Sequence, residues 1–238
     1  MKTVGVVVFP GSNCEHDVVE AAAAAGMDAR LLWHGDPTLA AGLDAVVLPG
    51  GFAHGDYLRP GAIARFSPVM DAVAAFARDG GPVVGICNGF QVLTEAGLLP
   101  GALRQNQGLK FLCTTVTTEV VTSRSALTRS VAPGTRLDLP INHFSGSYTC
   151  GREVLAQLRD LDAIVLRYTD NPNGSVADIA GICNEGGNVV GLMPHPERAC
   201  DPLGSLDGLR LWESLAGWVA GEGPASTVVA RTADSRPA

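Results

Sequence analysis

Several features that commonly identify a function are missing from this sequence. No two cysteines form a C-x-x-C pair, and no short cluster of cysteine and histidine has the spacing of zinc ligands. The six cysteines are scattered along the chain, so we expect reduced intracellular thiols and no bound metal. Neither a P-loop pattern nor G-x-G-x-x-G follows a predicted strand, so we expect no nucleotide site and no cofactor in this chain.

Positive charge and long hydrophobic runs are also scarce. The chain has 17 lysines and arginines against 24 aspartates and glutamates, a formal net charge of -7. An acidic chain is poorly suited to bind nucleic acid or an anionic membrane. No apolar run approaches the roughly 20 residues of a membrane-spanning helix, and residues 1–9 lack the length and cleavage site of a signal peptide. We therefore expect a cytoplasmic protein that binds neither nucleic acid nor membrane.

Hydrophobic residues, in contrast, make up 46% of the 238 positions, which is ample for one large α/β domain. Apolar, β-branched segments alternate with segments of helical spacing. The sequence predicts strands over 4–9, 29–33, 45–48, 82–86, 163–168, 179–183 and 189–193, and helices over 14–26, 66–78, 88–96, 153–159 and 206–219. This alternation predicts a mostly parallel sheet flanked by helices, with functional groups at the carboxyl ends of its strands.

The pattern changes after the middle of the chain. Residues 111–122 are rich in threonine and valine with partial alternation, and residues 135–141 form another short strand pattern. We therefore expect an additional antiparallel section. Beyond Gly221 the residues are mostly small and polar. We predict one domain over residues 1–220 and a disordered tail over residues 221–238.

A cysteine joins one predicted buried strand, 82–86, to the predicted helix that follows it. The junction reads Gly85-Ile86-Cys87-Asn88-Gly89. Glycines in these places permit the sharp turn of a nucleophile elbow, and the N-terminus of a helix favours a thiolate. Cys87 is therefore a candidate nucleophile, although a buried cysteine that only packs has the same local pattern.

A histidine and a glutamate follow the last predicted strand, within Pro194-His195-Pro196-Glu197. We expect both at the same edge of the sheet as Cys87. An imidazole can take the proton of a thiol and return it to a leaving amine, while a carboxylate holds the imidazole in one tautomer. A lone histidine is more often structural, but its pairing here with a cysteine elbow favours catalysis.

A pair of glycines provides candidate donors for a reacting carbonyl oxygen. Gly50-Gly51 closes the predicted strand 45–48, and glycines let backbone N–H groups approach a substrate closely. The N–H of Asn88, directly after the candidate nucleophile, is a second potential donor. A Gly-Gly pair taken alone more often marks a turn.

Taken together, these motifs resemble a known family. The order Gly-Gly-Phe, then Gly-Ile-Cys-Asn-Gly-Phe-Gln, then Pro-His-Pro-Glu-Arg is similar to that of class I glutamine amidotransferases, whose triad is Cys, His and Glu. More narrowly, residues 8–14, 50–61, 98–103, 171–175 and 193–198 resemble the glutaminase subunits of phosphoribosylformylglycinamidine synthases. The resemblance runs from about Lys2 to Val219 and implies a flavodoxin-like architecture.

The resemblance implies a role for each matching residue. It implies Cys87 as the nucleophile, His195 as the general base and acid, and Glu197 as the partner that orients His195. It also implies that the backbone N–H groups of Gly51 and Asn88 bind the oxyanion.

For substrate binding, the resemblance implies Gln91, Asn106 and His143. Ordinary helix packing is the alternative role for Gln91. Asn106, Lys110 and Phe111 lie in a segment like the family's loop after the elbow, where binding and structural roles are not separable from the sequence.

The resemblance further implies a division of labour between subunits. The chain is expected to hydrolyse L-glutamine through a γ-glutamyl thioester and to deliver ammonia to a large synthetase subunit. That partner is expected to use ATP and Mg²⁺ to convert formylglycinamide ribonucleotide to its amidine in purine biosynthesis, with a small third subunit in the complex.

One segment departs from the family pattern. Where a His-Gly-Glu-Gly sequence is expected, the chain has His143-Phe144-Ser145-Gly146. This departure leaves open a non-catalytic subunit that only regulates its partner. A related hydrolase with an elbow cysteine is the other alternative, although it is not expected to carry Pro-His-Pro-Glu-Arg after its last strand.

Overall fold

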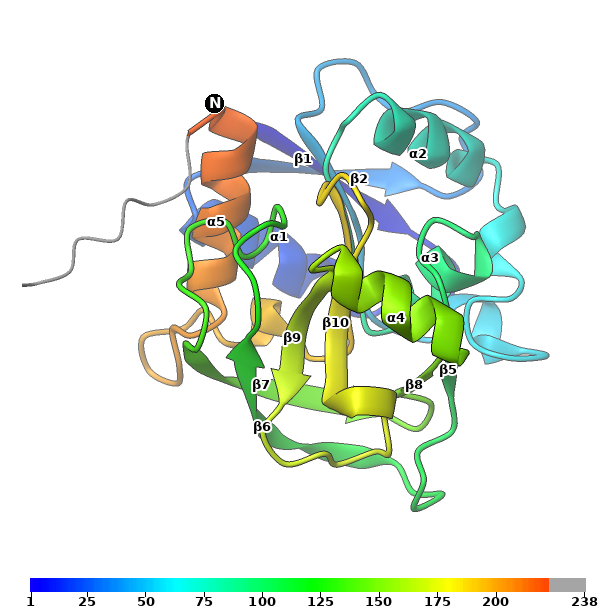
Figure 1. Cartoon of the computed structure of the whole chain (residues 1–238). Coiled ribbons are helices and arrows are strands. Elements are labelled where there is room, and N and C mark those ends of the chain that lie inside the picture. The colour runs from blue at the N-terminus through cyan, green and yellow to red at the C-terminus, as the bar shows by residue number, and fades with distance from the viewer. Residues whose placement is uncertain (223–238) are drawn as a thin grey trace, which may run out of the picture.

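The computed structural model describes residues 1–222 and has a nine-stranded sheet at its centre (Figure 1). The strands of this sheet are β1 (Thr3–Val8), β2 (Asp28–Trp33), β3 (Ala45–Leu48), β4 (Val83–Ile86), β6 (Leu112–Val120), β7 (Arg136–His143), β9 (Ile164–Tyr168), β10 (Ile179–Cys183) and β11 (Val189–Leu192). Their order across the sheet is β2-β1-β3-β4-β11-β10-β9-β6-β7. A separate antiparallel pair consists of β5 (Ala102–Arg104) and β8 (Ser147–Thr149).

The half of the sheet from β2 to β11 is parallel. Every residue of β3, β4 and β11 is buried. Their sequences are short apolar runs without polar alternation, as expected for strands covered on both faces. Because these strands run the same way, the loops that follow β1, β3, β4 and β11 meet at one edge of the sheet.

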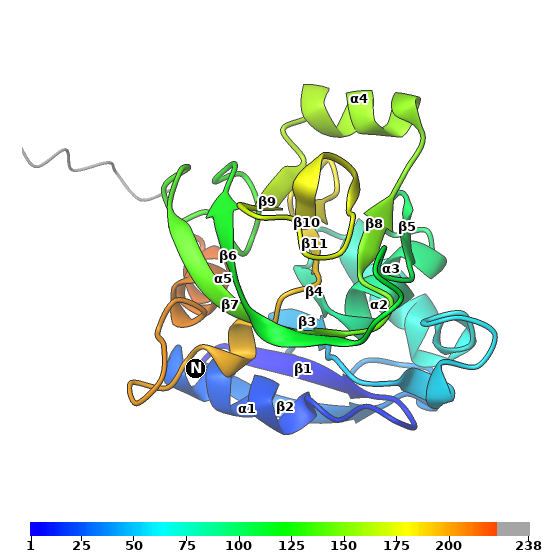
Figure 2. The same cartoon turned by 90° about the horizontal axis from the view of Figure 1, so that it is seen from below.

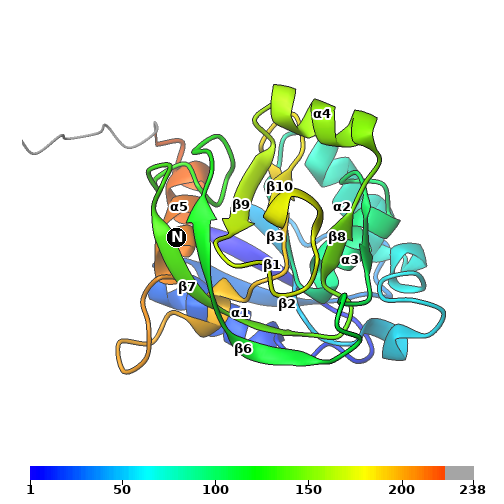
Figure 3. The ribbon, with the colours of Figure 1, turned by 60° about the horizontal axis from the view of Figure 1, so that its bottom comes forward.

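Helices cover both faces of the parallel half. These helices are α1 (Glu15–Ala24), α2 (Val69–Arg78), α3 (Asn88–Glu95) and α5 (Leu209–Ala220), whereas α4 (Arg152–Asp160) lies outside this half. The short 3₁₀ turns are η1 (Ala53–Asp56), η2 (Ala64–Phe66), η3 (Val176–Asp178) and η4 (Pro196–Arg198). Figures 1 and 3 show α1 and α5 together on one side of the sheet and α2 and α3 on the other.

The half from β10 to β7 is antiparallel. Figure 2 shows the long β6–β7 pair curling away from the parallel strands and toward β5 and β8, with α4 at the outer end of the molecule. The segment between β7 and β8 therefore passes in front of the edge where the parallel strands end. The architecture confirms the predicted parallel sheet flanked by helices with an additional antiparallel section.

Several details differ from the predictions made from sequence, and one is that the helix predicted over 206–219 begins only at Leu209. The helix predicted over 66–78 begins only at Val69, because Ser67 precedes a proline and has extended backbone (ψ 138°). The short strands β5 and β8 carry too few residues to show a pattern, and they were not predicted. Residues 223–238 of the predicted tail lie outside the described residues. No helix within residues 1–222 combines the length and apolar character needed to cross a membrane.

Candidate active site

Cys87 lies on a strained turn between β4 and α3. Its backbone has φ 51° and ψ -102°, a combination that ordinary L-residues rarely adopt. Both neighbouring glycines are required for packing. A Cβ on Gly89 would lie 1.9 Å from the Leu48 carbonyl oxygen, and one on Gly85 would lie 2.7 Å from the Gly89 carbonyl carbon. The predicted elbow is therefore present, and its glycines allow α3 to pack directly on β3 and β4.

The structure brings His195 and Glu197 together behind this turn. His195 Nδ1 lies 2.6 Å from Glu197 Oε1, and the two residues are 1% and 5% exposed. The His195 N–H donates to the Pro140 carbonyl (2.8 Å), which fixes the segment after β11. The other ring nitrogen, Nε2, is buried and has no hydrogen-bond partner within residues 1–222. The carboxylate thus orients the imidazole through Nδ1, while Nε2 is available to exchange a proton with a ligand.

Electrostatics favour the charged form of this imidazole. Burial alone would lower the pKa of His195, but the charge of Glu197, assisted by the neighbouring thiols of Cys87 and Cys14, outweighs burial and raises it well above its ordinary value. An imidazolium beside a thiol stabilises the thiolate. A charged His195 can therefore act as a proton donor.

The two backbone N–H groups predicted to bind an oxyanion belong to the loop after β3 and to the first residue of α3. Gly51 has φ 143°, and a Cβ there would lie 2.7 Å from Ser12 Cα, so the loop after β3 requires glycine. Asn88 is the first residue of α3, where a helical N–H has no acceptor within its own helix. The dipole of α3 adds partial positive charge at this point. Both donors that the sequence predicted are thus held by rigid backbone.

The side chain of Asn88 links the loop after β3 to α3. Its Oδ1 accepts from the Ala53 N–H (2.9 Å), and its Nδ2 donates to Asp56 Oδ1 (3.1 Å) and to Gln91 Oε1 (2.8 Å). Gln91 Nε2 in turn donates to the Ser145 carbonyl (2.6 Å). This chain of hydrogen bonds connects three loops around the elbow and orients Gln91, which is 5% exposed.

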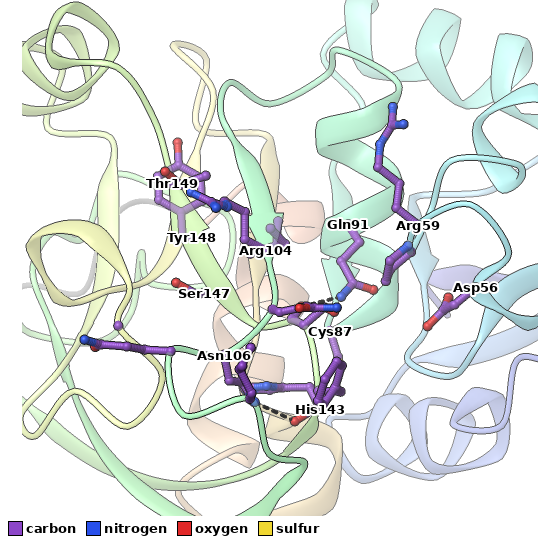
Figure 4. A pocket seen from close by; sticks show the side chains of 18 of the residues that line it. Asp56, Arg59, Cys87, Gln91, Arg104, Asn106, His143, Ser147, Tyr148 and Thr149 are labelled. Carbon is purple, nitrogen blue, oxygen red and sulfur yellow. Dashed lines mark hydrogen bonds between the residues drawn. The ribbon is translucent and has the colours of Figure 1, made fainter.

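A cavity of about 1000 Å³ opens in front of Cys87. Figure 4 shows Cys87 near the centre of this pocket, with Gln91 beside it and Asp56 and Arg104 toward opposite sides. The predicted residues in its lining are Gly51, Cys87, Gln91, Asn106 and His143. Asn88, His195 and Glu197 are not part of the lining. The nucleophile therefore faces the space for a ligand, and its acid–base partners are enclosed by protein.

Comparison with known proteins is decisive at this point. Residues 1–206 match the family model described as the CobB/CobQ-like glutamine amidotransferase domain. The chain belongs to the class I glutamine amidotransferases. Within them it falls among the PurQ subunits. The phosphoribosylformylglycinamidine synthase subunit PurQ of Rubrobacter xylanophilus is 59% identical over 89% of this chain and 96% of its own length.

Two further comparisons agree. The subunit of the same name from Parasynechococcus marenigrum is 58% identical over 90% of this chain and 99% of its own length. The solved structure of PurLQS from Thermotoga maritima contains a chain that is 40% identical, with a TM-score of 0.84 over 92% of this chain and 99% of that one. This chain is therefore a glutaminase-type enzyme subunit of purine biosynthesis, and its nine-stranded sheet is the amidotransferase fold.

Two of the predicted substrate-binding residues, Asn106 and His143, are buried in the cavity wall, and the side chain of Asn106 binds the protein's own backbone. Asn106 Nδ2 donates to the carbonyls of Lys110 and His143 (both 2.9 Å), and its Oδ1 accepts from the Gly146 N–H (3.0 Å). Asn106 is 1% exposed, so its side chain shapes the cavity wall by holding backbone. The ring of His143 packs closely against Gly146, since a Cβ on that glycine would lie 2.2 Å from the ring.

The environment of His143 keeps its ring neutral. Burial, followed by the charge of His195, lowers the pKa of His143 to about 4. Neither ring nitrogen has a hydrogen-bond partner within the described residues. In the amidotransferase this histidine is therefore a neutral polar group at the cavity wall.

Three neighbours of the site were not predicted from sequence. The Asn142 carbonyl lies 3.8 Å from Cys87 Sγ, Asp56 joins the Asn88 network, and Cys14 lies beside His195. Donor atoms of Cys14, His195 and Glu197 come within 4.8 Å of one another, the one such group with metal-ligand chemistry in residues 1–222. Arg198 Nη2 donates to Cys14 Sγ (3.2 Å), and this positive charge opposes a cation there. Only the folded chain brings these neighbours to the elbow.

Proposed function

We propose that this chain hydrolyses L-glutamine at Cys87 and supplies the ammonia to a synthetase subunit that converts formylglycinamide ribonucleotide to formylglycinamidine ribonucleotide. The observation that carries the proposal is the Glu197–His195 pair, 2.6 Å between Oε1 and Nδ1, enclosed behind a cysteine elbow that faces a cavity. The names of the PurQ relatives support the choice of pathway.

The first half-reaction forms a thioester. The Cys87 thiolate attacks the side-chain amide carbon of glutamine, and the carbonyl oxygen becomes an oxyanion held by the N–H groups of Gly51 and Asn88. As the carbon–nitrogen bond breaks, the His195 imidazolium donates its Nε2 proton to the leaving nitrogen, which departs as ammonia. The γ-glutamyl group remains on sulfur, and His195 is left neutral.

The second half-reaction consumes water. Neutral His195 accepts a proton from a water molecule while the water oxygen attacks the thioester carbon. The carbon–sulfur bond breaks, glutamate leaves, and the thiolate–imidazolium pair is restored. Glu197 holds the imidazole in one orientation through both steps and stabilises its charged form.

The proposal requires a partner. The relative from Thermotoga maritima is named as part of PurLQS, which supports a large synthetase subunit and a small third subunit for this chain as well. We assign ATP and Mg²⁺ to the synthetase, because no nucleotide-binding motif follows a strand here. Apolar side chains that are partly or largely exposed surround the cavity mouth, namely Phe52, Leu58, Leu109 and Phe144. Exposed apolar groups gathered at one opening are typical of a protein interface.

The test is glutamate release from L-glutamine, measured for the chain alone and then with its synthetase, ATP and formylglycinamide ribonucleotide. Strong stimulation by the complete mixture is expected. Cys87→Ala should abolish glutamine-dependent synthesis and leave synthesis from added ammonia intact. A rate of hydrolysis that does not change when the synthetase, ATP and formylglycinamide ribonucleotide are added would contradict the assigned pathway. Ammonia-driven synthesis without any glutaminase activity would identify a regulatory subunit.

A further inference from the structure

The cavity wall contains one carboxylate, and this carboxylate has no counter-charge within residues 1–222. Asp56 is the only acidic residue among the described residues that line the cavity. Its carboxylate accepts a hydrogen bond from Asn88 Nδ2 (3.1 Å) and makes no ion pair within residues 1–222. The nearby cation, Arg59, is already bound by both carboxylate oxygens of Glu95 (2.6 and 2.7 Å). The protein thus leaves a half-buried negative charge facing the ligand space.

The position of Asp56 relative to the nucleophile is fixed. Asn88 directly follows Cys87, and its Nδ2 donates to Asp56 Oδ1. The Oδ1 of the same Asn88 side chain accepts from the Ala53 N–H, which fixes the orientation of the amide. A single side chain, that of Asn88, therefore links the Asp56 carboxylate to the elbow. Figure 4 shows Asp56 on the Arg59 side of the pocket, with Cys87 and Gln91 nearer its centre.

The substrate of the proposed reaction brings a matching charge to this region. When its amide carbon sits at Cys87 Sγ, the α-carbon of glutamine lies three carbon–carbon bonds away, about 4 Å in an extended chain. The α-ammonium group attached there needs an acceptor, and an anion supplies the strongest hydrogen bonds to it. A partly buried carboxylate without a counter-ion is costly to the protein, so a site of this kind gains most when a cationic ligand binds.

We propose that Asp56 binds the α-ammonium group of L-glutamine and thereby selects α-amino amides over amides that lack this group. This inference rests on the proposed glutaminase function. The environment of the carboxylate supports it, since burial, only partly offset by the Asn88 hydrogen bond, raises the pKa of Asp56 to about 6. That direction is expected for a carboxylate whose partner arrives with the substrate.

The experiment compares two substrates in the complete complex with synthetase, ATP and formylglycinamide ribonucleotide. L-Glutamine is one, and glutaramic acid, which has hydrogen in place of the α-amino group, is the other. Wild-type protein should prefer glutamine in kcat/KM. Asp56→Asn keeps an acceptor for Asn88 but removes the charge, and it should lower kcat/KM for glutamine about 10- to 100-fold, the range of a charged hydrogen bond. The value for glutaramic acid should stay within about threefold.

Controls separate recognition from folding. Asp71→Asn, the same change at an exposed position of α2, should leave both substrates unaffected. Ammonia-driven synthesis by the Asp56→Asn complex should equal that of the wild type, which reports an intact assembly. If the Asn variant does not fold, the wild-type preference alone is informative, because the absence of any preference for glutamine overturns the proposal.

Two other outcomes also overturn it. An equal loss of kcat/KM for both amides would assign Asp56 a structural role through Asn88, and an unchanged value for glutamine would remove it from recognition. Failure of the proposed function itself looks different, because the wild-type complex would then release ammonia from neither amide, with neither glutamate nor glutarate formed.

Discussion

The segments that carry Cys87, His195 and Glu197, here called the frame, and the wall of the cavity are built in different ways. The frame follows two neighbouring parallel strands, β4 and β11. Ile86 pairs with Leu192 in register, and the Cys87 N–H donates to the Leu192 carbonyl (2.8 Å), so the residues that follow each strand emerge side by side. The wall consists of segments far apart in sequence. Hydrogen bonds from side-chain amides to backbone N–H and carbonyl groups connect these segments.

This difference determines how each part responds to change. In the frame, geometry is set by close packing, as at Gly89, where even one methyl group would overlap the Leu48 carbonyl. In the wall, Asn106 Oδ1 accepts from the Gly146 N–H, and Asn173 Nδ2 donates to the Gly146 carbonyl. Changes to the frame should therefore reduce the rate of the chemical step, and changes to the wall should alter substrate binding and stability.

The largest effect is expected at Glu197. Glu197→Gln removes the charge that stabilises the imidazolium and permits the wrong tautomer of His195, so kcat for glutamine should fall about 10²- to 10⁴-fold. Because Glu197 raises the pKa of His195, the acid–base profile of the residual activity should also shift to lower pH. Steady-state glutamate release across pH measures both effects. A loss confined to KM would place Glu197 outside the frame.

The sequence was informative about the frame because its determinants are local. The Gly85-Ile86-Cys87-Asn88-Gly89 and Pro194-His195-Pro196-Glu197 segments carry the turn chemistry within a few residues, and burial on both faces appears as unbroken apolar strands. These patterns predicted the parallel sheet and the edge at which the two segments meet.

The wall could not be derived in the same way. Asp56 becomes part of the site only through a hydrogen bond to Asn88, 32 residues further along the chain. Cys14 reaches His195 across the sheet edge, and no local spacing records that contact. Asn106 looked like a ligand residue in the sequence, but the fold uses its amide for Lys110, His143 and Gly146 backbone.

A second prediction concerns stability and uses the buried ring of His143. Its pKa of about 4 in the folded protein lies below the ordinary value of 6.5, so the unfolded chain binds more protons between these values. Stability should thus be complete above pH 6.5 and decline as pH falls toward 4. The contribution of His143 to this decline is about 3 kcal/mol.

The measurement is urea denaturation of wild type and His143→Gln at several pH values. The variant should lose about 3 kcal/mol less than the wild type between pH 7 and pH 4. His16→Gln, at an exposed position of α1, controls for the loss of one histidine. Parallel pH-dependence in wild type and His143→Gln would contradict the assignment of a neutral, buried ring.

The smallest effect is expected for Asn106→Ala, and it best distinguishes the binding role of the wall from the catalytic role of the frame. Asn106→Ala leaves the Gly146 N–H and two carbonyls without their partner, so the β7–β8 segment should loosen. We expect KM for glutamine to rise about tenfold with kcat within about threefold of wild type, because Cys87, His195 and Glu197 do not depend on this segment's amide contacts. Steady-state kinetics in the complete complex provide both constants.

Asn188→Ala is the matched control for this prediction. Asn188 is also buried, and its Nδ2 donates to two backbone carbonyls, those of Ala77 (2.8 Å) and Gly81 (2.9 Å), but it lies before β11 and outside the cavity lining. Both variants should unfold at lower urea concentration, while only Asn106→Ala should raise KM. If the two variants change KM equally, the wall has no binding role separate from general stability, and the distinction between the two regions fails. If instead Asn106→Ala lowers kcat as strongly as Glu197→Gln, the wall also positions the reacting groups.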